Sequence, residues 1–426
     1  MTSVHPAVVR LDGTARLSPE VIGGKAFGID MMRRHGLPVP PAFCLTTAVG
    51  ADFLTRPGDT LDGVWDGVLA GVGWLERQSA RTFGRGPQPL LLGVRGGAAR
   101  SMPGLLATVL DVGITPEVRE ALAEAYGPAV ATDIATRFAS GYTPLCGKVI
   151  PEDPADQLRA AITAVFSSWN SPSPLSYRHH YGLDDNLGTA AVVQAMVFGN
   201  LARDSGTGVV FSRNPVTGTD EPFGEWTPGR QGTDLVSGIA DGQPLAALAR
   251  SQPAVHRQLL DAAARLADLA GEPVEVEFTV ESGRLWILQS RVVVGTVASA
   301  VPQMVESTMA TTVLATGTPA SPGSATGRAY ADVDAALDAA DRGESVILLR
   351  PTTSPDDVPA MFAARGVVTE IGGATSHAAV LSREIGRPAV VGCGPGLVDR
   401  LDGRLITVDG TTGEVREPES GKVGDD

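Results

Sequence analysis

The last third of the sequence alternates short apolar runs with short amphipathic segments, and this alternation limits the fold more than any other feature. The apolar runs are SVILLR, GVVTE, PAVVGC and LITVD, and the segments that precede or separate them are DVDAALDAADRG, SPDDVPAMFAARG and SHAAVLSREIG. The runs have the length and β-branched content of strands, and the segments have the spacing of short helices. The pattern predicts a compact α/β domain of about 100 residues. It includes a strand-turn-strand in LITVDGTTGEVRE.

A stretch without clear periodicity separates this region from the preceding one. Residues 292–320 are rich in Val, Ala, Thr and Pro and follow neither helical nor strand spacing. The preceding region has longer helical patterns, PEVREALAEAYG and PADQLRAAITAVFSSW, and the strand patterns PLLLGVR, TGVVFSR and PVEVEFTV. A chain of 426 residues has room for two or three domains. We therefore expect a domain boundary within 292–320.

The composition indicates packed domains without a broad positive surface. The chain is 43% hydrophobic and 19% charged, with a net charge of −14. This charge argues against general binding to nucleic acid or anionic membranes, so a phosphate-bearing ligand requires a local positive cluster. Three widely spaced cysteines, Cys44, Cys146 and Cys393, predict neither a disulfide framework nor a metal site. Without a signal-peptide pattern or a long apolar run, we expect a soluble cytoplasmic protein.

The segment GGATSHAAVLSREIG, 372–386, places His377 in front of a predicted helix. Thr375 or Ser376 can cap that helix, and Gly386 is expected to end it. A neutral imidazole is a good nucleophile near neutral pH, and a helix N-terminus favours phosphoryl oxygens. The simpler interpretation is a histidine satisfied by its neighbours at a turn.

The segment EPVEVEFTVESGRLWILQSR, 272–291, reads as a β-hairpin with one polar face on its first strand. A three-residue loop, Ser282–Arg284, would pair Glu277 with Gln289 and Glu275 with Arg291. Two carboxylates, an amide and a guanidinium would then share one surface, where hard cations such as Mg²⁺ find oxygen ligands. The simpler interpretation is a solvated hairpin with a salt bridge between Glu275 and Arg291.

Two glycine-rich stretches could approach an anion. In LLLGVRGGAARSMPGLLATV a strand is expected to end at Arg95, before a loop that holds Gly96, Gly97 and Gly104 around Ser101. In VIGGKAFGIDMM, Lys25 follows a glycine pair and precedes a helix. Glycines allow close approach of backbone amides, and arginine matches phosphate geometry. Neither stretch has P-loop spacing, and each alone more often forms an ordinary turn.

Together these stretches resemble the N-terminal and central parts of the pyruvate, phosphate dikinase family, and more distantly phosphoenolpyruvate synthases and rifampicin phosphotransferases. The resemblance rests on SMPG, VFSRNP and TSHA, and it extends over nearly the whole chain in the family's order. It implies a multidomain α/β (α+β) protein, in which an ATP-grasp nucleotide-binding domain is followed by a swivelling β/β/α phosphohistidine domain. The implied divisions are an ATP-grasp domain at 1–295, a linker at 296–311, the phosphohistidine domain at 312–420 and a polar tail at 421–426.

The resemblance also implies roles for individual residues. His377 would be phosphorylated, and in some relatives the threonine at the position of Thr375 is a regulatory phosphorylation site. Glu277 and Gln289 would bind Mg²⁺. The residues implied to bind the nucleotide or its phosphates are Lys25, Arg95, Gly96, Gly97, Ser101, Gly104, Arg137 (the weaker candidate), Gln194, Met196, Val197, Glu275, Gln289 and Arg291.

The implied activity is an ATP-dependent phosphotransfer of the dikinase type. ATP would phosphorylate His377 through a pyrophosphoryl-histidine and release AMP, with orthophosphate or water as the second substrate. The sequence contains no counterpart of the family's (β/α)₈ barrel, so we expect a truncated enzyme whose acceptor is a small molecule or a separate protein, for example a chain that binds phosphoenolpyruvate or pyruvate. The alternatives are a non-catalytic phosphocarrier and a degenerate nucleotide-binding remnant.

Overall fold

A computed structural model describes most of the chain. The described residues are 6–215, 217–232, 242–293 and 312–418. The expected linker at 296–311 and the expected tail at 421–426 therefore lie outside them. The described chain forms two compact units. Unit 1 is Met1–Gly206, Pro228–Arg230 and Glu277–Arg291, and unit 2 is Thr207–Thr227, Gln231–Val276 and Val292–Asp426.

Unit 1 contains a five-stranded antiparallel sheet with the order β1-β2-β7-β5-β6. Its strands are β1 (Val8–Arg10), β2 (Ala42–Leu45), β5 (Leu92–Gly97), β6 (Thr108–Val112) and β7 (Ala190–Ala195). A short parallel pair, β3 (Thr82–Phe83) and β4 (Pro89–Leu90), precedes β5. Strand β7 is fully buried and pairs with β5 so that Val192 lies opposite Arg95. The centre of the sheet therefore presents Arg95 from a rigid element.

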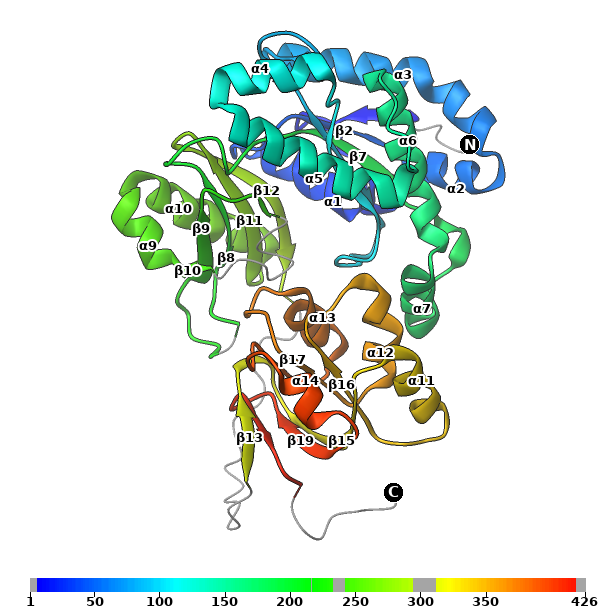
Figure 1. The fold of residues 1–426 in the computed structure, drawn as a ribbon. Helices are drawn as coiled ribbons and strands as arrows, with labels where there is room; N and C mark the ends of the chain where they lie inside the picture. Colours follow the sequence, from blue (N-terminus) through cyan, green and yellow to red (C-terminus); the bar gives the residue numbers. More distant parts are fainter. Residues whose placement is uncertain (1–5, 216, 233–241, 294–311, 419–426) are drawn as a thin grey trace. The chain divides into compact units, whose positions relative to one another are not determined.

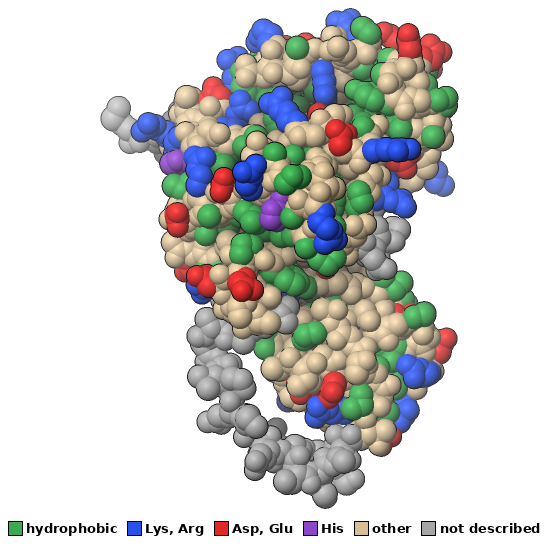
Figure 2. All heavy atoms as spheres, turned by 90° about the vertical axis from the view of Figure 1, so that its left-hand side faces the viewer, with side chains coloured by type: hydrophobic (Ala, Val, Ile, Leu, Met, Phe, Trp, Pro, Cys, Tyr) green, Lys and Arg blue, Asp and Glu red, His purple; other side chains and the backbone are tan. Residues whose placement is uncertain are grey.

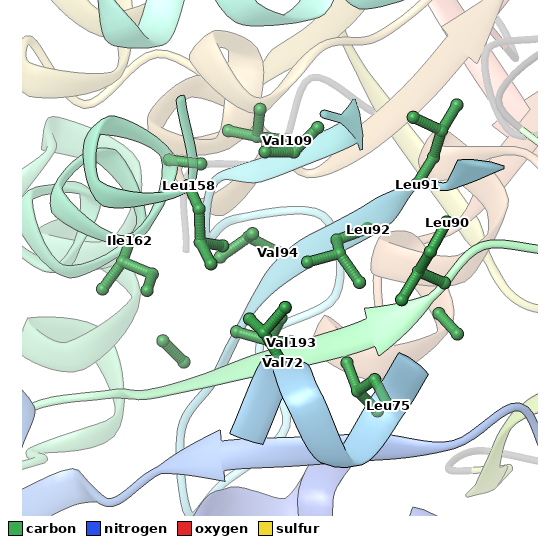
Figure 3. Close-up of a cluster of buried hydrophobic side chains, with 14 of the residues drawn as sticks. Val72, Leu75, Leu90, Leu91, Leu92, Val94, Val109, Leu158, Ile162 and Val193 are labelled. Carbon is green, nitrogen blue, oxygen red and sulfur yellow. The ribbon is translucent and has the colours of Figure 1, made fainter. Parts of the chain in front are cut away.

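Helices pack on this sheet (Figure 1). The helices of unit 1 are α1 (Pro19–Arg34), α2 (Thr47–Thr55), α3 (Pro57–Ser79), α4 (Pro116–Tyr126), α5 (Pro128–Cys146), α6 (Pro154–Ser167) and α7 (Pro172–Tyr181), with 3₁₀ turns at Ser168–Asn170 and Asp185–Leu187. Figure 3 shows part of the core, where Val72 and Leu75 of α3 and Ile162 of α6 lie near strand residues such as Val94 and Val193. All of these side chains are buried, so helices and sheet share one apolar core.

A second five-stranded sheet has the order β10-β9-β8-β11-β12. Its strands are β8 (Gly206–Phe211), β9 (Phe223–Pro228), β10 (Gln243–Pro244), β11 (Val274–Glu281) and β12 (Arg284–Val292), and the helices α9 (Leu245–Ser251) and α10 (Pro253–Ala270) lie between β10 and β11 in sequence. Strands β11 and β12 form the hairpin expected from the alternation in 272–291. The segment of this hairpin that belongs to unit 1 is Glu277–Arg291.

Unit 2 contains an eight-stranded sheet with the order β13-β20-β19-β15-β16-β17-β18-β14. Its strands are β13 (Val313–Thr316), β14 (Thr318–Ser321), β15 (Ser324–Tyr330), β16 (Val346–Arg350), β17 (Gly366–Thr369), β18 (Ala389–Val391), β19 (Leu405–Asp409) and β20 (Glu414–Arg416). The strands from β15 to β18 run parallel, as expected for a strand-helix alternation. The helices are α11 (Val333–Asp341), α12 (Val358–Ala363), α13 (His377–Ile385) and α14 (Leu397–Leu401), with a 3₁₀ turn at Pro355–Asp357.

The structure confirms the mixed α/β, multidomain fold class and corrects two details. Strand β5 does not end at Arg95, because Gly96 and Gly97 pair with Ala191 and Ala190 of β7. The hairpin loop is not Ser282–Arg284, because Arg284 already belongs to β12. The turn is Ser282 and Gly283, both with positive φ (48° and 75°), which suits a two-residue connection between twisted strands. The pairing of Glu277 with Gln289 and of Glu275 with Arg291 stays a prediction.

Charged side chains are distributed over the surface. Figure 2 shows one face, on which Lys and Arg side chains are interspersed with Asp and Glu and do not gather in one large patch. On this face, positive groups that could hold a phosphate therefore occur in small clusters at most. None of the helices in that part of the chain has both the length and the apolar character needed to cross a bilayer.

Candidate functional site

Arg95 of β5 connects two oxygen-bearing side chains of the β11–β12 hairpin. Its Nη2 donates a hydrogen bond to Oε1 of Gln289 at 3.1 Å and lies 3.5 Å from Oε2 of Glu277. The side chains of Arg95 and Glu277 are 17% and 26% exposed, so the pair is neither sealed in the core nor fully solvated. The predicted gathering of Glu277 and Gln289 is thus present, and Arg95 contacts both residues.

Lys25 belongs to the same group because two glycines let helix α1 approach the end of β5. Gly23 interrupts α1 with φ of 78°, and a Cβ there would lie 1.9 Å from the Gly97 carbonyl oxygen. A Cβ on Gly97 would lie 3.2 Å from Cβ of Lys25. Burial lowers the pKa of Lys25 well below its usual value, the positive charges of Arg95 and Arg291 lower this pKa further, and Glu277 opposes them. Burial and the neighbouring positive charges therefore disfavour the charged form of Lys25 in this cluster.

Glu275 and Arg291 lie at the far end of the same hairpin. Glu275 is 6% exposed on β11, and Arg291 is half-buried on β12. Within the described residues, Asp, Glu, His and Cys side chains do not gather in threes around a point where a metal ion could bind. Mg²⁺ in nucleotide sites commonly has only one or two carboxylate ligands and completes its shell with phosphates and water. The oxygens of Glu277 and Gln289 fit that kind of site.

The expected glycine loop, 96–104, begins within strand β5 and ends in an exposed segment. Gly96 and Gly97 are buried in β5, whereas Ser101 and Gly104 are exposed in the segment that follows. Gly104 has φ of 71°, which favours glycine at this turn. The main-chain carbonyl of Ser101 accepts a hydrogen bond from the hydroxyl of Tyr177 on α7 at 3.0 Å. The loop is thus tied to α7 and presents the Ser101 side chain to solvent.

The segment with Gln194, Met196 and Val197 continues β7. Gln194 is buried, and its Nε2 donates to the carbonyl of Pro40 at 3.2 Å. The main-chain N–H of Met196 donates to the carbonyl of Leu91, the residue directly before β5, at 2.9 Å. The strand pairing therefore extends to Met196 and fixes the start of this segment.

Arg137, the weaker candidate for a phosphate contact, lies in a polar cluster on α5. Its Nε is 2.9 Å from Oδ2 of Asp133, which also accepts a hydrogen bond from Nδ2 of Asn200 at 2.8 Å. Asp111 is part of the same electrostatic environment. Burial raises the pKa of Asp111 to about 7, while Arg137 lowers this pKa and Asp133 raises it. The structure therefore gives Arg137 acidic neighbours.

His377 is the first residue of α13. Ser376 caps this helix by accepting a hydrogen bond from the N–H of Ala379, and Gly386 ends it in a left-handed conformation with φ of 67°. Of the two expected capping residues, Ser376 is thus the one used. Nδ1 of His377 lies 3.1 Å from the hydroxyl of Thr353, in the loop after β16. This contact orients the imidazole at the helix N-terminus, where backbone N–H groups and the helix dipole favour anions.

Thr375 contacts a carboxylate. Its hydroxyl donates a hydrogen bond to Oε2 of Glu225, on β9 of the same unit, at 3.0 Å. Thr375 is only 7% exposed. A phosphate on this hydroxyl would therefore replace a hydrogen bond to a carboxylate by repulsion between two negative groups.

Sequence reasoning missed the partners of these residues. Thr353 and Glu225 have no local signal that links them to His377 and Thr375, because the contacts span 24 and 150 positions. The alternation that selected Glu275 and Glu277 continues to Glu281 and could have selected it too. Arg81, the partner of Glu281 at 3.3 Å, is 200 positions away.

Two family models match the chain. Residues 76–262 match the pyruvate phosphate dikinase, AMP/ATP-binding domain. Residues 343–413 match the PEP-utilising enzyme, mobile domain. The first match includes Arg95 and the segment after β7, and the second includes Thr353 and His377.

Individual relatives extend the similarity over most of the chain. The pyruvate, phosphate dikinase of Rhizobium meliloti (strain 1021) is 33% identical over 500 residues, which covers 93% of this chain and 56% of the relative. That of Clostridium symbiosum is 31% identical over 488 residues, with the same coverage of 93% and 56%. An NMR structure of Enzyme I is 34% identical over 19% of this chain and 34% of that chain, with a TM-score of 0.17.

The chain spans about half the length of the curated relatives it matches. The similarity to these relatives extends over 93% of this chain. The chain therefore belongs to the pyruvate, phosphate dikinase family of PEP-utilising enzymes.

Proposed function

We propose that this protein is a phosphotransferase that takes a phosphoryl group from ATP and carries it on His377. The observation that supports this proposal most strongly is the contact of Arg95 with both Gln289 and Glu277, beside a lysine whose pKa is lowered. Forked positive donors next to acidic oxygens suit a polyphosphate with its metal ion. The imidazole at the start of α13 supports the second part of the proposal.

The ATP site that we propose extends from a phosphate end to a base end. Glu277 and Glu281 lie on the same side of β11, about 13 Å apart at the usual rise of a strand. Glu277 contacts Arg95, whereas Glu281 accepts the N–H of Phe198 in the segment after β7. The same distance of four residues separates two positions at β5. Leu91, directly before this strand, accepts the N–H of Met196, and Arg95 lies four residues later in the strand. This span suits an extended nucleoside triphosphate.

Roles follow from this placement. Lys25, Arg95 and Arg291 would bind phosphate oxygens, and bound phosphates would favour the charged form of Lys25. Glu277 and Gln289 would hold Mg²⁺, which when bound neutralises charge on the phosphate oxygens. Further contacts in the proposed site are assigned to Glu275 and Arg137, to Gly96, Gly97, Ser101 and Gly104 near the phosphates, and to Gln194, Met196 and Val197 near the base.

The proposed transfer follows dikinase chemistry. A ring nitrogen of His377 forms a bond to the β-phosphorus of ATP, and the bond from that phosphorus to the oxygen of the α-phosphate breaks, so AMP leaves with the electron pair. The terminal phosphoryl group then passes to orthophosphate or water and leaves a phosphohistidine. When Nδ1 carries the ring proton, it donates to Thr353, and the lone pair for attack is on Nε2.

The acceptor that we propose for the phosphohistidine is a small molecule or a separate protein, with pyruvate bound by another chain as the first choice. Similarity to pyruvate, phosphate dikinases supports pyruvate in this role. In this transfer a base of the pyruvate-binding chain would take a proton from the methyl carbon of pyruvate, the resulting enolate oxygen would form an O–P bond, and the N–P bond would break to give phosphoenolpyruvate and neutral His377.

Labelled ATP tests the proposal. The full chain is incubated with Mg²⁺ and ATP labelled at the β or the γ phosphate, and both protein-bound label and AMP are followed. We expect acid-labile, base-stable β label on the protein, release of AMP, and loss of both in His377→Ala. The exposed histidine His179 provides the matched control, because His179→Ala should label as the wild type does.

Other outcomes would overturn parts of the proposal. γ label with ADP as the product would exclude the pyrophosphoryl step. Stable label on His377 that neither orthophosphate, water nor pyruvate removes would favour a phosphocarrier. The absence of both labelling and ATP binding would favour a nucleotide-binding remnant and contradict the whole proposal.

A further inference from the structure

Arg81 and Glu281 form a closed ring of contacts around Val197. Nη1 of Arg81 donates to the main-chain carbonyl of Met196 at 3.4 Å, and its Nη2 lies 3.3 Å from Oε2 of Glu281. The other carboxylate oxygen, Oε1, accepts the main-chain N–H of Phe198 at 3.2 Å. One ion pair thus binds the peptide groups on both sides of a single residue.

The ring lies in a shielded environment. The side chain of Glu281 is 11% exposed and that of Arg81 is 27% exposed, while Val197 and Phe198 are buried. Charge-assisted hydrogen bonds are stronger where water is largely excluded. Arg81 follows α3, and Glu281 is the last residue of β11, so the ring connects helix, hairpin and the end of β7 within unit 1.

The ring of contacts fixes the direction of the main chain between Met196 and Phe198. The N–H of Met196 is already held by Leu91, which continues the β5–β7 pairing. With the Met196 carbonyl and the Phe198 N–H held by side chains, the chain at Val197 is restrained from both sides. A base is distinguished by its pattern of donors and acceptors only if the main-chain groups facing it have fixed directions.

The spacing along β11 gives the ring its place in the site. Glu281 lies four residues after Glu277 on the same side of the strand, so the ring is about 13 Å from the contacts of Arg95. Strand β11 therefore carries two carboxylates. Glu277 contacts Arg95 in the proposed phosphate cluster, and Glu281 contacts the segment that follows β7.

We infer that Arg81 and Glu281 are positioning residues that set the affinity and base selectivity of the nucleotide site. The pair acts through the main chain at Val197 and does not contact the reacting phosphates. This inference rests on the proposed binding of ATP. According to this inference, the Arg81–Glu281 ion pair, which lies outside the phosphate cluster, makes the site prefer adenine to other bases.

Binding of two nucleotides to the full chain tests the inference. Dissociation constants for Mg-ATP and Mg-GTP are measured by calorimetry for the wild type, Arg81→Met and Glu281→Gln. The exposed Arg85 gives the matched control, Arg85→Met. We expect the wild type to prefer ATP, and we expect Arg81→Met to bind ATP about tenfold more weakly, as for one lost hydrogen bond. GTP affinity should change less, so the preference for ATP should fall.

Glu281→Gln should have a smaller effect, because the amide oxygen can still accept the N–H of Phe198. Labelling of His377 at saturating ATP should proceed in both variants at a rate close to that of the wild type, which a general loss of folding would not allow. Equal weakening of ATP and GTP, unchanged affinities, or a wild type that binds ATP and GTP equally would each overturn the inference. A wild type that binds neither nucleotide would instead overturn the proposed function.

Discussion

Nδ1 of His377 and the hydroxyl of Thr353 lie 3.1 Å apart, so the first residue of α13 is fixed by the loop that follows β16. The helix cap at Ser376 fixes the backbone of this histidine, and Thr353 fixes its ring. Orientation of a nucleophile before the reaction lowers the entropic part of the barrier. We therefore expect the contact to speed the proposed phosphorylation of His377, separately from any effect on stability.

Thr353→Val keeps the shape of the side chain and removes the hydroxyl. We expect the rate of phosphate labelling at saturating ATP to fall about tenfold, as for one lost hydrogen bond of about 1.4 kcal/mol. Thr353→Ser, which restores the hydroxyl, should recover most of the rate. Quenched-flow labelling measures the rate, and an unchanged rate in Thr353→Val would contradict the role of the contact.

We expect a negative charge at position 375 to destabilise the folded chain, because the hydroxyl of Thr375 contacts the carboxylate of Glu225. Thr375→Asp imitates part of a phosphate and places a carboxylate against Glu225, so the melting temperature should fall by a few degrees, as for roughly 1 kcal/mol of repulsion. Adding Glu225→Gln to Thr375→Asp should recover most of this loss. Differential scanning fluorimetry checks both variants. Equal melting temperatures of the single and double variants would show that the two side chains do not interact in this way.

Gly23 tests the approach of α1 to β5. Gly23→Ala places a Cβ against the Gly97 carbonyl at a φ of 78°, and we expect the free energy of unfolding to fall by at least about 2 kcal/mol. Gly63→Ala, in α3 and with open space around it, should instead be neutral or stabilise by about 0.5–1 kcal/mol. Urea unfolding of the full chain compares the two. A Gly23→Ala protein as stable as Gly63→Ala would refute the close approach.

Asp111 predicts a pH dependence of stability. Its pKa is raised to about 7 in the folded chain, so between about pH 4 and 7 the folded state keeps a proton that the unfolded state has released. The contribution of this residue to stability therefore falls as the pH rises through this window and is constant above it. Asp111→Asn cannot ionise, and asparagine tolerates the φ of 58° at this position.

We therefore expect Asp111→Asn to be more stable than the wild type at pH 8, and more stable by a clearly smaller margin at pH 5. Urea midpoints at both pH values give the comparison. The exposed Asp261 on α10 provides the control, since Asp261→Asn should shift stability by the same small amount at each pH. A difference between Asp111→Asn and the wild type that does not grow with pH would contradict the raised pKa.

Elements with strong local signals could be predicted from the sequence. The pattern PEVREALAEAYG gives α4, and the cap, apolar face and final glycine of GGATSHAAVLSREIG give α13. Strands β13 and β14 could not be predicted, and their position explains why. They are the two edges of the eight-stranded sheet, where a strand pairs on one side only. Edge strands of four residues leave little alternation to detect.

The candidate site could be predicted only in part. Residue types and the family resemblance selected Glu277, Gln289 and Arg95, but the distances between them depend on contacts across 194 positions. The turn at Ser282 and Gly283 was misjudged by one residue, because Arg284 is as compatible with a turn as with the start of a strand. Arg81 gave no local signal, since its role depends on where the folded chain places Glu281.

The placement of Glu277 and Glu281 on one side of β11 has a consequence for how this sequence can change. Substitutions on the opposite side of the strand leave the two carboxylates where they are. The insertion or deletion of a single residue between them would turn one carboxylate to the other side, because side chains alternate along a strand. Chains that preserve this site should therefore vary in composition along β11 yet keep its length between these two positions constant, so that loops absorb the differences in length.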